Sequence, residues 1–184
     1  AHAALGDARR AITYYEQALA VMQEIGDRQA EGSILGNLGI AYERLGEIPQ
    51  AITYYEQALG ISREIGDRRG EGSALGNLGI AYERLGEIPQ AIPYYQQALE
   101  LARAIGDRQG EATHCWNLGT LYEQQGDLAQ AAQLMQVCVD FEREIGHPDA
   151  EKDAAHLARV QARRGGGADH EGREGHEGHE GGGA

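Results

Sequence analysis

The sequence predicts an all-α fold, an α-α superhelix (solenoid) of stacked helix hairpins with about three and a half repeats and a C-terminal capping helix. Three observations support this fold class. The stretch GNLGIAYERLGEIPQAI occurs at 36–52 and again, unchanged, at 76–92, which sets a repeat of forty residues. Within each repeat, apolar and small residues recur at intervals of three and four, the spacing of one helix face. Glycine followed by an acidic residue recurs between these segments, as expected for helix ends.

Each repeat contains two predicted helices of about eighteen residues. In the first complete repeat, the apolar stripe of the first helix runs from Leu35 to Leu45, and that of the second helix runs from Ile48 to Ser62. Gly46 is placed to end the first helix in the left-handed conformation. The residues show no alternation of period two, so a β-propeller with a similar repeat length is excluded.

Aligned on this repeat, the chain divides into one partial repeat and three complete repeats. A partial repeat at 1–25 begins with the stub of a first helix at 1–5, and complete repeats follow at 28–65, 68–105 and 108–145. A last helix at 149–164 carries charged residues where the inner repeats have core residues, which is typical of a cap, so the array covers 1–164. Residues 165–184 have almost no apolar side chains and predict a disordered tail.

The composition excludes several classes of function. A net charge of −13 disfavours nucleic acid and anionic membranes as partners. The sequence contains neither a membrane-spanning apolar run nor a secretion signal, so we expect a cytoplasmic location. Cys115 and Cys138 fall on core-facing positions and are predicted to be buried free thiols.

No arrangement of residues indicates catalysis. The sequence shows no nucleophile–base pair, phosphate-binding loop or structural metal motif, so we expect no enzymatic activity, no cofactor and no metal site. His170, His176 and His179 in the tail are candidate weak ligands of a divalent ion, with a solvated spacer as the preferred interpretation.

The repeat resembles the tetratricopeptide repeat (TPR). The family pattern W-x2-L-G-x2-Y, followed by A-x3-F, is matched in three successive repeats over about residues 1–164. The matching residues are Leu35, Leu38, Gly39, Tyr42, Ala51 and Tyr55, then Leu75, Leu78, Gly79, Tyr82, Ala91 and Tyr95, then Cys115, Leu118, Gly119, Tyr122, Ala131 and Met135.

The repeat also departs from the family pattern. Leucine or cysteine replaces the tryptophan, and Arg63, Arg103 and Arg143 replace the proline that usually closes the repeat. In its length, the repeat is similar to the extended TPR subclass of Pins/LGN-type scaffolds, kinesin light chains and bacterial regulator arrays. This resemblance implies a concave groove, lined by the first helix of each pair, that accepts partner segments. The near identity of two repeats indicates recent duplication or consensus design.

A stripe next to the core face of these first helices is the candidate peptide-binding site. Its members are Ser33, Asn37, Ile40 and Arg44, then Ser73, Asn77, Ile80 and Arg84, then Thr113, Trp116, Asn117, Thr120 and Gln124. The stacked asparagines can pair with the N–H and C=O groups of an extended peptide, because a carboxamide both donates and accepts hydrogen bonds. The alternative is that they satisfy hydrogen bonds inside the array.

The arginines of the stripe have two interpretations. Arg44 and Arg84 are placed to hold carboxylates of an acidic partner. Alternatively, they form ion pairs with Glu43, Glu83 or a neighbouring helix.

Three residues at one repeat position shape the predicted groove floor. Gly36 and Gly76 stand where a carboxylate clamp would need lysines, and they are expected to let a partner backbone approach closely. Trp116 takes the same position in the third repeat, either as an exposed anchor or half-buried against a neighbouring helix.

The leading hypothesis is therefore a protein–protein interaction module that binds a peptide or protein segment, acidic or extended, in the groove. The alternative is a sensor or regulatory segment of a larger signalling ATPase or transcription regulator. A third hypothesis is self-association through the truncated N-terminal repeat, or a designed array without a natural ligand.

Overall fold

A computed structural model describes residues 2–168, with side chains from 6 to 165. This part of the chain forms eight α-helices and no strands, which confirms the all-α prediction. The helices are α1 (His2–Ile25), α2 (Arg28–Leu45), α3 (Ile48–Ile65), α4 (Arg68–Arg84), α5 (Ile88–Ile105), α6 (Arg108–Gln124), α7 (Leu128–Ile145) and α8 (Ala150–Ala168). The chain divides into two compact units, Ala1–Leu118 and Gly119–Ala184, with the boundary inside α6.

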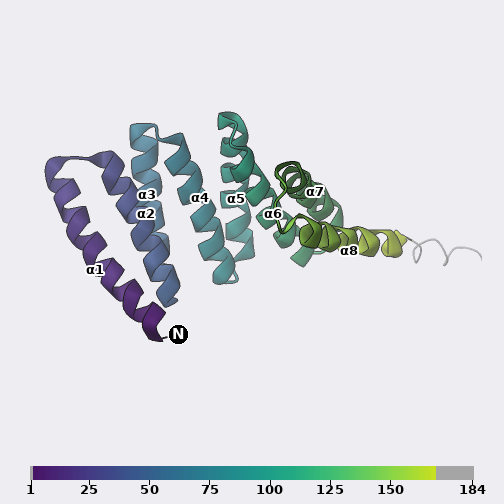
Figure 1. Cartoon of the computed structure of the whole chain (residues 1–184), viewed down its shortest axis with the longest axis horizontal. Helices are drawn as coiled ribbons and strands as arrows, with labels where there is room; N and C mark the ends of the chain where they lie inside the picture. Colours follow the sequence, from purple (N-terminus) through teal and green to yellow (C-terminus); the bar gives the residue numbers. More distant parts are fainter. Residues whose placement is uncertain (1, 169–184) are drawn as a thin grey trace, which may run out of the picture. The chain divides into compact units, whose positions relative to one another are not determined.

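Helices that follow one another in the chain pack together within each unit. In the first unit, α1 to α5 lie side by side in chain order, and α2 also contacts α4 (Figure 1). In the second unit, α7 packs against α8. This packing of consecutive helices is the solenoid arrangement that the repeat predicts.

The turns are built by the repeated glycines, each followed by an acidic residue in the first three hairpins. Gly46 ends α2 with φ +79° and Gly66 ends α3 with φ +72°. Residues other than glycine rarely adopt this left-handed backbone conformation. Asp67 then caps α4, because its Oδ1 accepts the N–H of Gly70 at 3.0 Å.

Two helix bounds differ from the sequence alignment. The predicted stub at 1–5 is continuous with the rest of α1, and Gly6 does not have the positive φ of its counterpart Gly46. Gly46 lies in the turn between α2 and α3, which pack on each other, whereas Gly6 lies within α1. The last helix begins at Ala150 and continues to Ala168, past the predicted end at 164. The rest of the predicted tail, with its three histidines, lies outside the described residues.

A glycine pressed against a tyrosine ring joins the two helices of a hairpin. A Cβ added to Gly39 of α2 would lie 2.5 Å from Tyr55 Cδ1, and one added to Gly79 of α4 would lie 2.7 Å from Tyr95 Cδ1. Both tyrosines are fully buried, and the Tyr55 hydroxyl donates to Glu43 Oε2 at 2.8 Å. The glycine is therefore required for close approach of the two helices.

The two tyrosines of the Tyr54–Tyr55 pair differ in burial. Tyr55 belongs to the core, whereas its neighbour Tyr54 is partly buried and stacks on Tyr42 with ring centroids 5.2 Å apart. Burial and the nearby Tyr54 raise the pKa of Tyr42 to about 12. Cys115 and Cys138 are buried free thiols, as predicted, and burial raises the pKa of Cys115 to about 11.

We expect Gly39→Ala to lower the free energy of unfolding by about 1–3 kcal/mol, because the added methyl group overlaps the buried Tyr55 ring. Gly36, one turn earlier on the same helix, is the matched control, since an added Cβ meets nothing within 4 Å. Gly36→Ala should raise the free energy of unfolding by about 0.5–1 kcal/mol. Chemical denaturation of both variants measures this difference, and equal effects would show that the glycine–tyrosine contact is not restrictive.

A side chain at the end of each second helix reaches a glutamate in the first turn of the next helix. The pairs are Gln23–Glu31 at 3.1 Å, Arg63–Glu71 at 2.9 Å, Arg103–Glu111 at 2.7 Å and Arg143–Glu151 at 3.3 Å. Glu71 is almost buried and is also bound by Arg68 at 3.1 Å. The arginines that replace the family's closing proline therefore connect one hairpin to the next.

We expect Arg63→Ala to cost about 1.5–3 kcal/mol of stability, because the Glu71 carboxylate then loses a charged partner while it remains buried. Arg143→Ala is the matched control and should cost only about 0–1 kcal/mol. Both arginines are 50% exposed, but the Glu71 side chain is 11% exposed and that of Glu151 is 83% exposed. Thermal unfolding of the two variants compares their losses of stability. A larger loss of stability in Arg143→Ala than in Arg63→Ala would contradict the prediction.

The second unit contains a poorly solvated carboxyl group. Glu142 Oε2 is buried without a hydrogen-bond partner in the described residues, and Oε1 lies 3.6 Å from His147 Nδ1. Burial, followed by the nearby charge of Asp153, raises the pKa of Glu142 above its ordinary value of 4.5. The ionised form is thus less favourable in the folded than in the unfolded chain.

The raised pKa of Glu142 predicts a pH dependence of stability. Because the folded chain binds the proton more tightly, Glu142 lowers the stability as the pH rises from 4.5 through its folded-state pKa. Glu142→Gln should therefore unfold at higher denaturant concentration than the parent at pH 7, and this advantage should vanish near pH 4. An advantage that persists unchanged at pH 4 would assign the effect to packing instead of ionisation.

Candidate functional site

Two equivalent pockets open between the first helices of successive hairpins in the first unit. The α2–α4 pocket lies over α3 and has a volume of about 220 Å³, and the α4–α6 pocket lies over α5 and has a volume of about 330 Å³. Every residue that lines the α2–α4 pocket has a counterpart forty positions later that lines the α4–α6 pocket. Equivalent positions of successive sequence repeats therefore form equivalent cavities.

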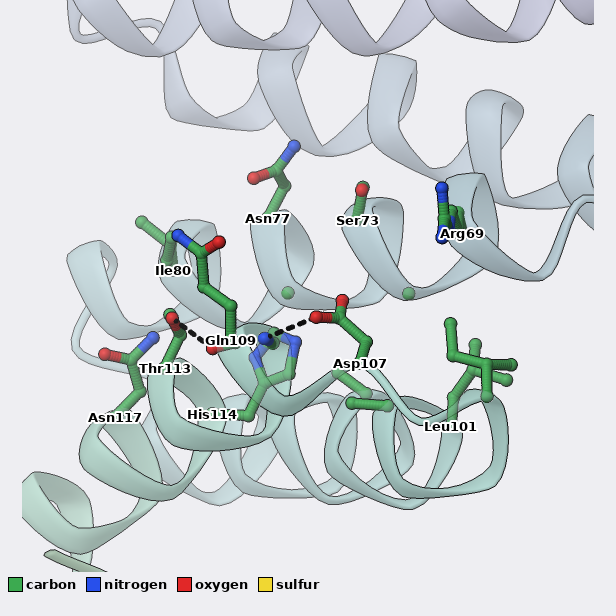
Figure 2. A pocket seen from close by; sticks show the side chains of 16 residues that line it. Arg69, Ser73, Asn77, Ile80, Leu101, Asp107, Gln109, Thr113, His114 and Asn117 are labelled. Atoms are coloured by element: carbon green, nitrogen blue, oxygen red, sulfur yellow. Dashed lines mark hydrogen bonds between the residues drawn. The ribbon is translucent and has the colours of Figure 1, made fainter. Parts of the chain in front are cut away.

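Most of the predicted stripe lines these pockets. Ser33, Asn37 and Ile40 line the α2–α4 pocket, Ser73 and Asn77 line both pockets, and Ile80, Thr113 and Asn117 line the α4–α6 pocket. Figure 2 shows Ser73 and Asn77 on one helix, with Thr113 and Asn117 on the next. Arg44, Arg84 and Trp116 lie outside both pockets. Thr120 and Gln124 belong to the second unit.

The first two asparagines of the stripe are not used inside the array. Neither the Asn37 nor the Asn77 carboxamide makes a hydrogen bond to another described residue. Asn37 is exposed and Asn77 is half-buried, so both amide groups remain available to a ligand. Asn117, in contrast, already interacts with the protein. The alternative of internal hydrogen bonding therefore does not describe Asn37 or Asn77.

The two arginines of the stripe differ in their surroundings. Arg84 Nη2 lies 3.1 Å from Glu43 Oε1 on the neighbouring first helix, which is the ion pair proposed as the alternative to partner binding. Glu43 also accepts the hydroxyl of Tyr55, so Arg84 extends a network that begins in the core. Arg44 is exposed at the end of α2 and forms no ion pair with the residues that the structure describes.

The two glycines of the groove floor are not equivalent. Gly36 has open space around it, as predicted. Gly76 is covered, since an added Cβ would lie 2.8 Å from Cε1 of His114, and the predicted open floor is wrong at this position. The physical reason is the residue opposite, which is Ala74 facing Gly36 but His114 facing Gly76. Trp116, the third member of this position, is half-buried.

His114 is a neutral polar group inside the α4–α6 pocket. Its Nδ1 is buried and has no hydrogen-bond partner in the described part of the chain. Burial lowers the pKa of His114 below its ordinary value of 6.5, so the imidazole is uncharged at pH 7. The ring is tilted against Tyr95, with centroids 6.4 Å apart.

Sequence reasoning missed the residues at the mouth of each pocket. Gln29 and Asp67 border the α2–α4 pocket, and Arg69 and Asp107 are their counterparts at the α4–α6 pocket. Gln29 precedes Ser33 by one helical turn, so extending the stripe by four residues toward the N-terminus would have included it. The N–H of Gly70, followed by the Gln29 amide, lowers the pKa of Asp67, which stays ionised at neutral pH.

The first helix of the chain exposes apolar side chains. Tyr14 is 71%, Val21 50% and Ile25 63% exposed. In the next hairpin, the counterpart of Tyr14 stacks on Tyr42, and the counterpart of Val21 is buried against Gly32. This is the surface to which the sequence assigned self-association.

The described residues contain neither a metal-binding cluster nor a membrane-spanning helix. Between residues 2 and 168, no group of three or more histidine, cysteine, aspartate or glutamate side chains is arranged to hold a metal ion. No helix in the same range is long and apolar enough to cross a membrane.

Solved structures share this fold. BtubC (BKLC) from P. vanneervenii superposes with a TM-score of 0.71 and 24% identity, over 97% of this chain and 80% of that one. A kinesin light chain-like protein from Podosopora anserina, described as having nearly identical TPR-like repeats, gives a TM-score of 0.69 and 15% identity over 89% and 83%.

A third match is a signal-transduction ATPase with a tetratricopeptide repeat sensor from Pyrococcus horikoshii. It gives a TM-score of 0.77 and 22% identity, and the likeness covers 86% of this chain but only 25% of the ATPase. At these identities, the three likenesses establish the fold alone. They include two of the classes that the repeat resembles, the kinesin light chains and the signalling sensor arrays.

No curated protein sequence matches the chain. The family model for the tetratricopeptide repeat matches residues 1–64 and 70–144. Since these matches cover more than half of the sequence, the chain belongs to the tetratricopeptide repeat family, whose repeats are non-catalytic scaffolds that generally serve in protein interaction.

Proposed function

We propose that the chain binds an extended segment of a partner protein along the strip formed by the α2–α4 and α4–α6 pockets. The observation that carries this proposal is the pair of carboxamides, Asn37 and Asn77, which are one repeat apart and without a hydrogen-bond partner in the described residues. Both side chains line the strip, and Asn77 stands between the two pockets.

Two asparagines at this spacing suit recognition of a peptide backbone. Each carboxamide offers both a donor and an acceptor, which match the C=O and N–H of a bound segment whatever its side chains. An extended segment leaves these groups unpaired, whereas a helix uses them internally. The strip therefore favours an extended partner over a helical one.

The surroundings of Asn37 leave room for such a segment. Apart from the two chain neighbours and the backbone of α2 itself, no atom lies within 4 Å of the position that a Cβ on Gly36 would take, so a partner backbone can approach the helix closely. Ile40, one turn farther along, is 38% exposed and offers an apolar contact beside the polar one. Polar groups that fix orientation beside apolar surface are the usual composition of a binding site.

We expect the double variant Asn37→Ala/Asn77→Ala to bind peptides selected by the parent chain about 10-fold more weakly or worse, because two hydrogen-bonding amides are lost. Peptide display on the parent identifies the ligands, and titration calorimetry compares the affinities. The matched control is Gln57→Ala, an exposed residue of α3 that lines neither pocket, and it should bind like the parent.

Circular dichroism must show equal helicity for the three proteins before the affinities are compared. If the double variant and the parent bind the same peptides equally well, the asparagines are not the binding groups and the proposal fails. A parent chain that selects no peptide would contradict it as well.

A further inference from the structure

The mouths of the two pockets differ although their walls repeat. At the α2–α4 pocket, the Gln29 side chain closes across the opening and donates from Nε2 to Asp67 Oδ2 at 2.8 Å. At the α4–α6 pocket, Arg69 and Asp107 occupy the two corresponding positions, and no ion pair joins them in the part of the chain that the structure describes. Figure 2 shows the two side chains on opposite sides of the opening, with no interaction drawn between them.

The larger volume of the α4–α6 pocket agrees with this open mouth. Its volume of about 330 Å³ exceeds the 220 Å³ of its counterpart, even though His114 replaces the smaller Ala74 in its lining. The α4–α6 pocket also extends over Leu101 and Gln109, whose counterparts do not line the α2–α4 pocket, so the open mouth is one of several differences between the two cavities.

One oxygen of the Asp107 carboxylate accepts a hydrogen bond from the protein, and the other accepts none from the described residues. Oδ1 accepts the N–H of Gly110 at 2.9 Å and so caps α6. Oδ2 has no hydrogen-bond partner among the described residues, whereas the same atom of Asp67 is held by the Gln29 carboxamide. The chain itself therefore shows which chemical group fits this acceptor.

Across the opening, Arg69 supplies donors only. Its guanidinium has no ion pair within the described residues and carries N–H groups that favour a carbonyl or carboxylate oxygen. The opening therefore presents an acceptor on one side and a donor on the other, and a carboxamide satisfies both at once.

We propose that the α4–α6 pocket holds a carboxamide side chain, glutamine or asparagine, of the bound segment, with its N–H donated to Asp107 Oδ2 and its carbonyl accepting from Arg69. This inference rests on the proposed function, because it assigns one side chain of the segment bound along the strip. The α2–α4 pocket is already closed by the carboxamide of Gln29, so selection occurs at one position of the partner.

Charged side chains fit the opening less well. A carboxylate would be attracted by Arg69 but repelled by Asp107, and Asp67 on the other side of Arg69 offsets part of its charge. An ammonium group would be attracted by Asp107 but repelled by Arg69. The neutral His114 below adds no charge that would favour either one.

Exchange of residues between the two mouths tests this inference. Arg69→Gln gives the α4–α6 pocket the closing side chain of its counterpart, and Gln29→Arg opens the α2–α4 pocket. Each substitution places a residue that the chain already carries at the equivalent position, so both variants should keep the parent's helicity. Peptide display on the parent and on both variants then reports the preferred residue at every position.

We expect the parent to enrich glutamine or asparagine at one peptide position and Arg69→Gln to lose this enrichment while it still binds. Gln29→Arg should enrich a carboxamide at a second position. Replacing the selected carboxamide by alanine should weaken binding to the parent about 10-fold, and binding to Arg69→Gln by less than about 2-fold.

The other outcomes overturn the inference in distinguishable ways. Enrichment of acidic residues would assign recognition to Arg69 alone, and enrichment of basic residues would assign it to Asp107 alone. An unchanged carboxamide preference in Arg69→Gln would place that side chain elsewhere. If binding depends on Asn37 and Asn77 but no position depends on Arg69, the proposed function stands and this inference fails, whereas a parent that selects no peptide contradicts both.

Discussion

The close contact of a helical glycine with a buried tyrosine ring is the constraint on which the rest of the structure depends. Gly39 against Tyr55 and Gly79 against Tyr95 fix how near the first helix of a hairpin lies to the second. That separation sets where the polar faces of α2 and α4 stand over the intervening α3. The same tyrosine hydroxyl holds Glu43, which in turn pairs with Arg84 of the next hairpin. Tyr55 therefore takes part both in packing within its own hairpin and, through Glu43, in the contact with Arg84 of the next hairpin.

The connection between hairpins also has an ionic component that changes along the chain. The glutamate that receives an arginine from the preceding helix is 11% exposed at Glu71, 27% at Glu111 and 83% at Glu151, whereas Glu31 receives the uncharged Gln23. A pair shielded from water gains more from its charges than a solvated one. This contact consequently holds the hairpins of the first unit together more firmly than it holds α8 to α7.

The sequence predicts features that depend on one helix face, but it does not predict contacts between residues of two different hairpins. The forty-residue period follows from the repeated stretch at 36–52 and 76–92. The two helices per repeat, the buried Tyr55 and the stripe with Asn37 follow from residues three and four apart, and the structure contains them. The hydrogen bond from Gln29 to Asp67 joins residues 38 positions apart, and neither residue alone predicts this contact. The contact that covers Gly76 with His114 likewise joins residues of two hairpins, so the sequence does not predict it. The continuous α1 is a further case, because the glycine at one repeat position ends α2 at Gly46 but lies inside α1 at Gly6.

The residues that border the pocket mouths lie outside the glycine–tyrosine contacts, and this separation has a consequence for how such an array can change. Gene duplication copies the scaffold intact, and a later exchange at Gln29 or Arg69 alters one cavity without disturbing the helices that form it. In the binding mode that we propose, each additional hairpin would supply a new recognition position that can evolve, or be engineered, independently of its neighbours. The length of the array would then set the length of the partner motif, and the residue at each mouth would select one side chain of that motif.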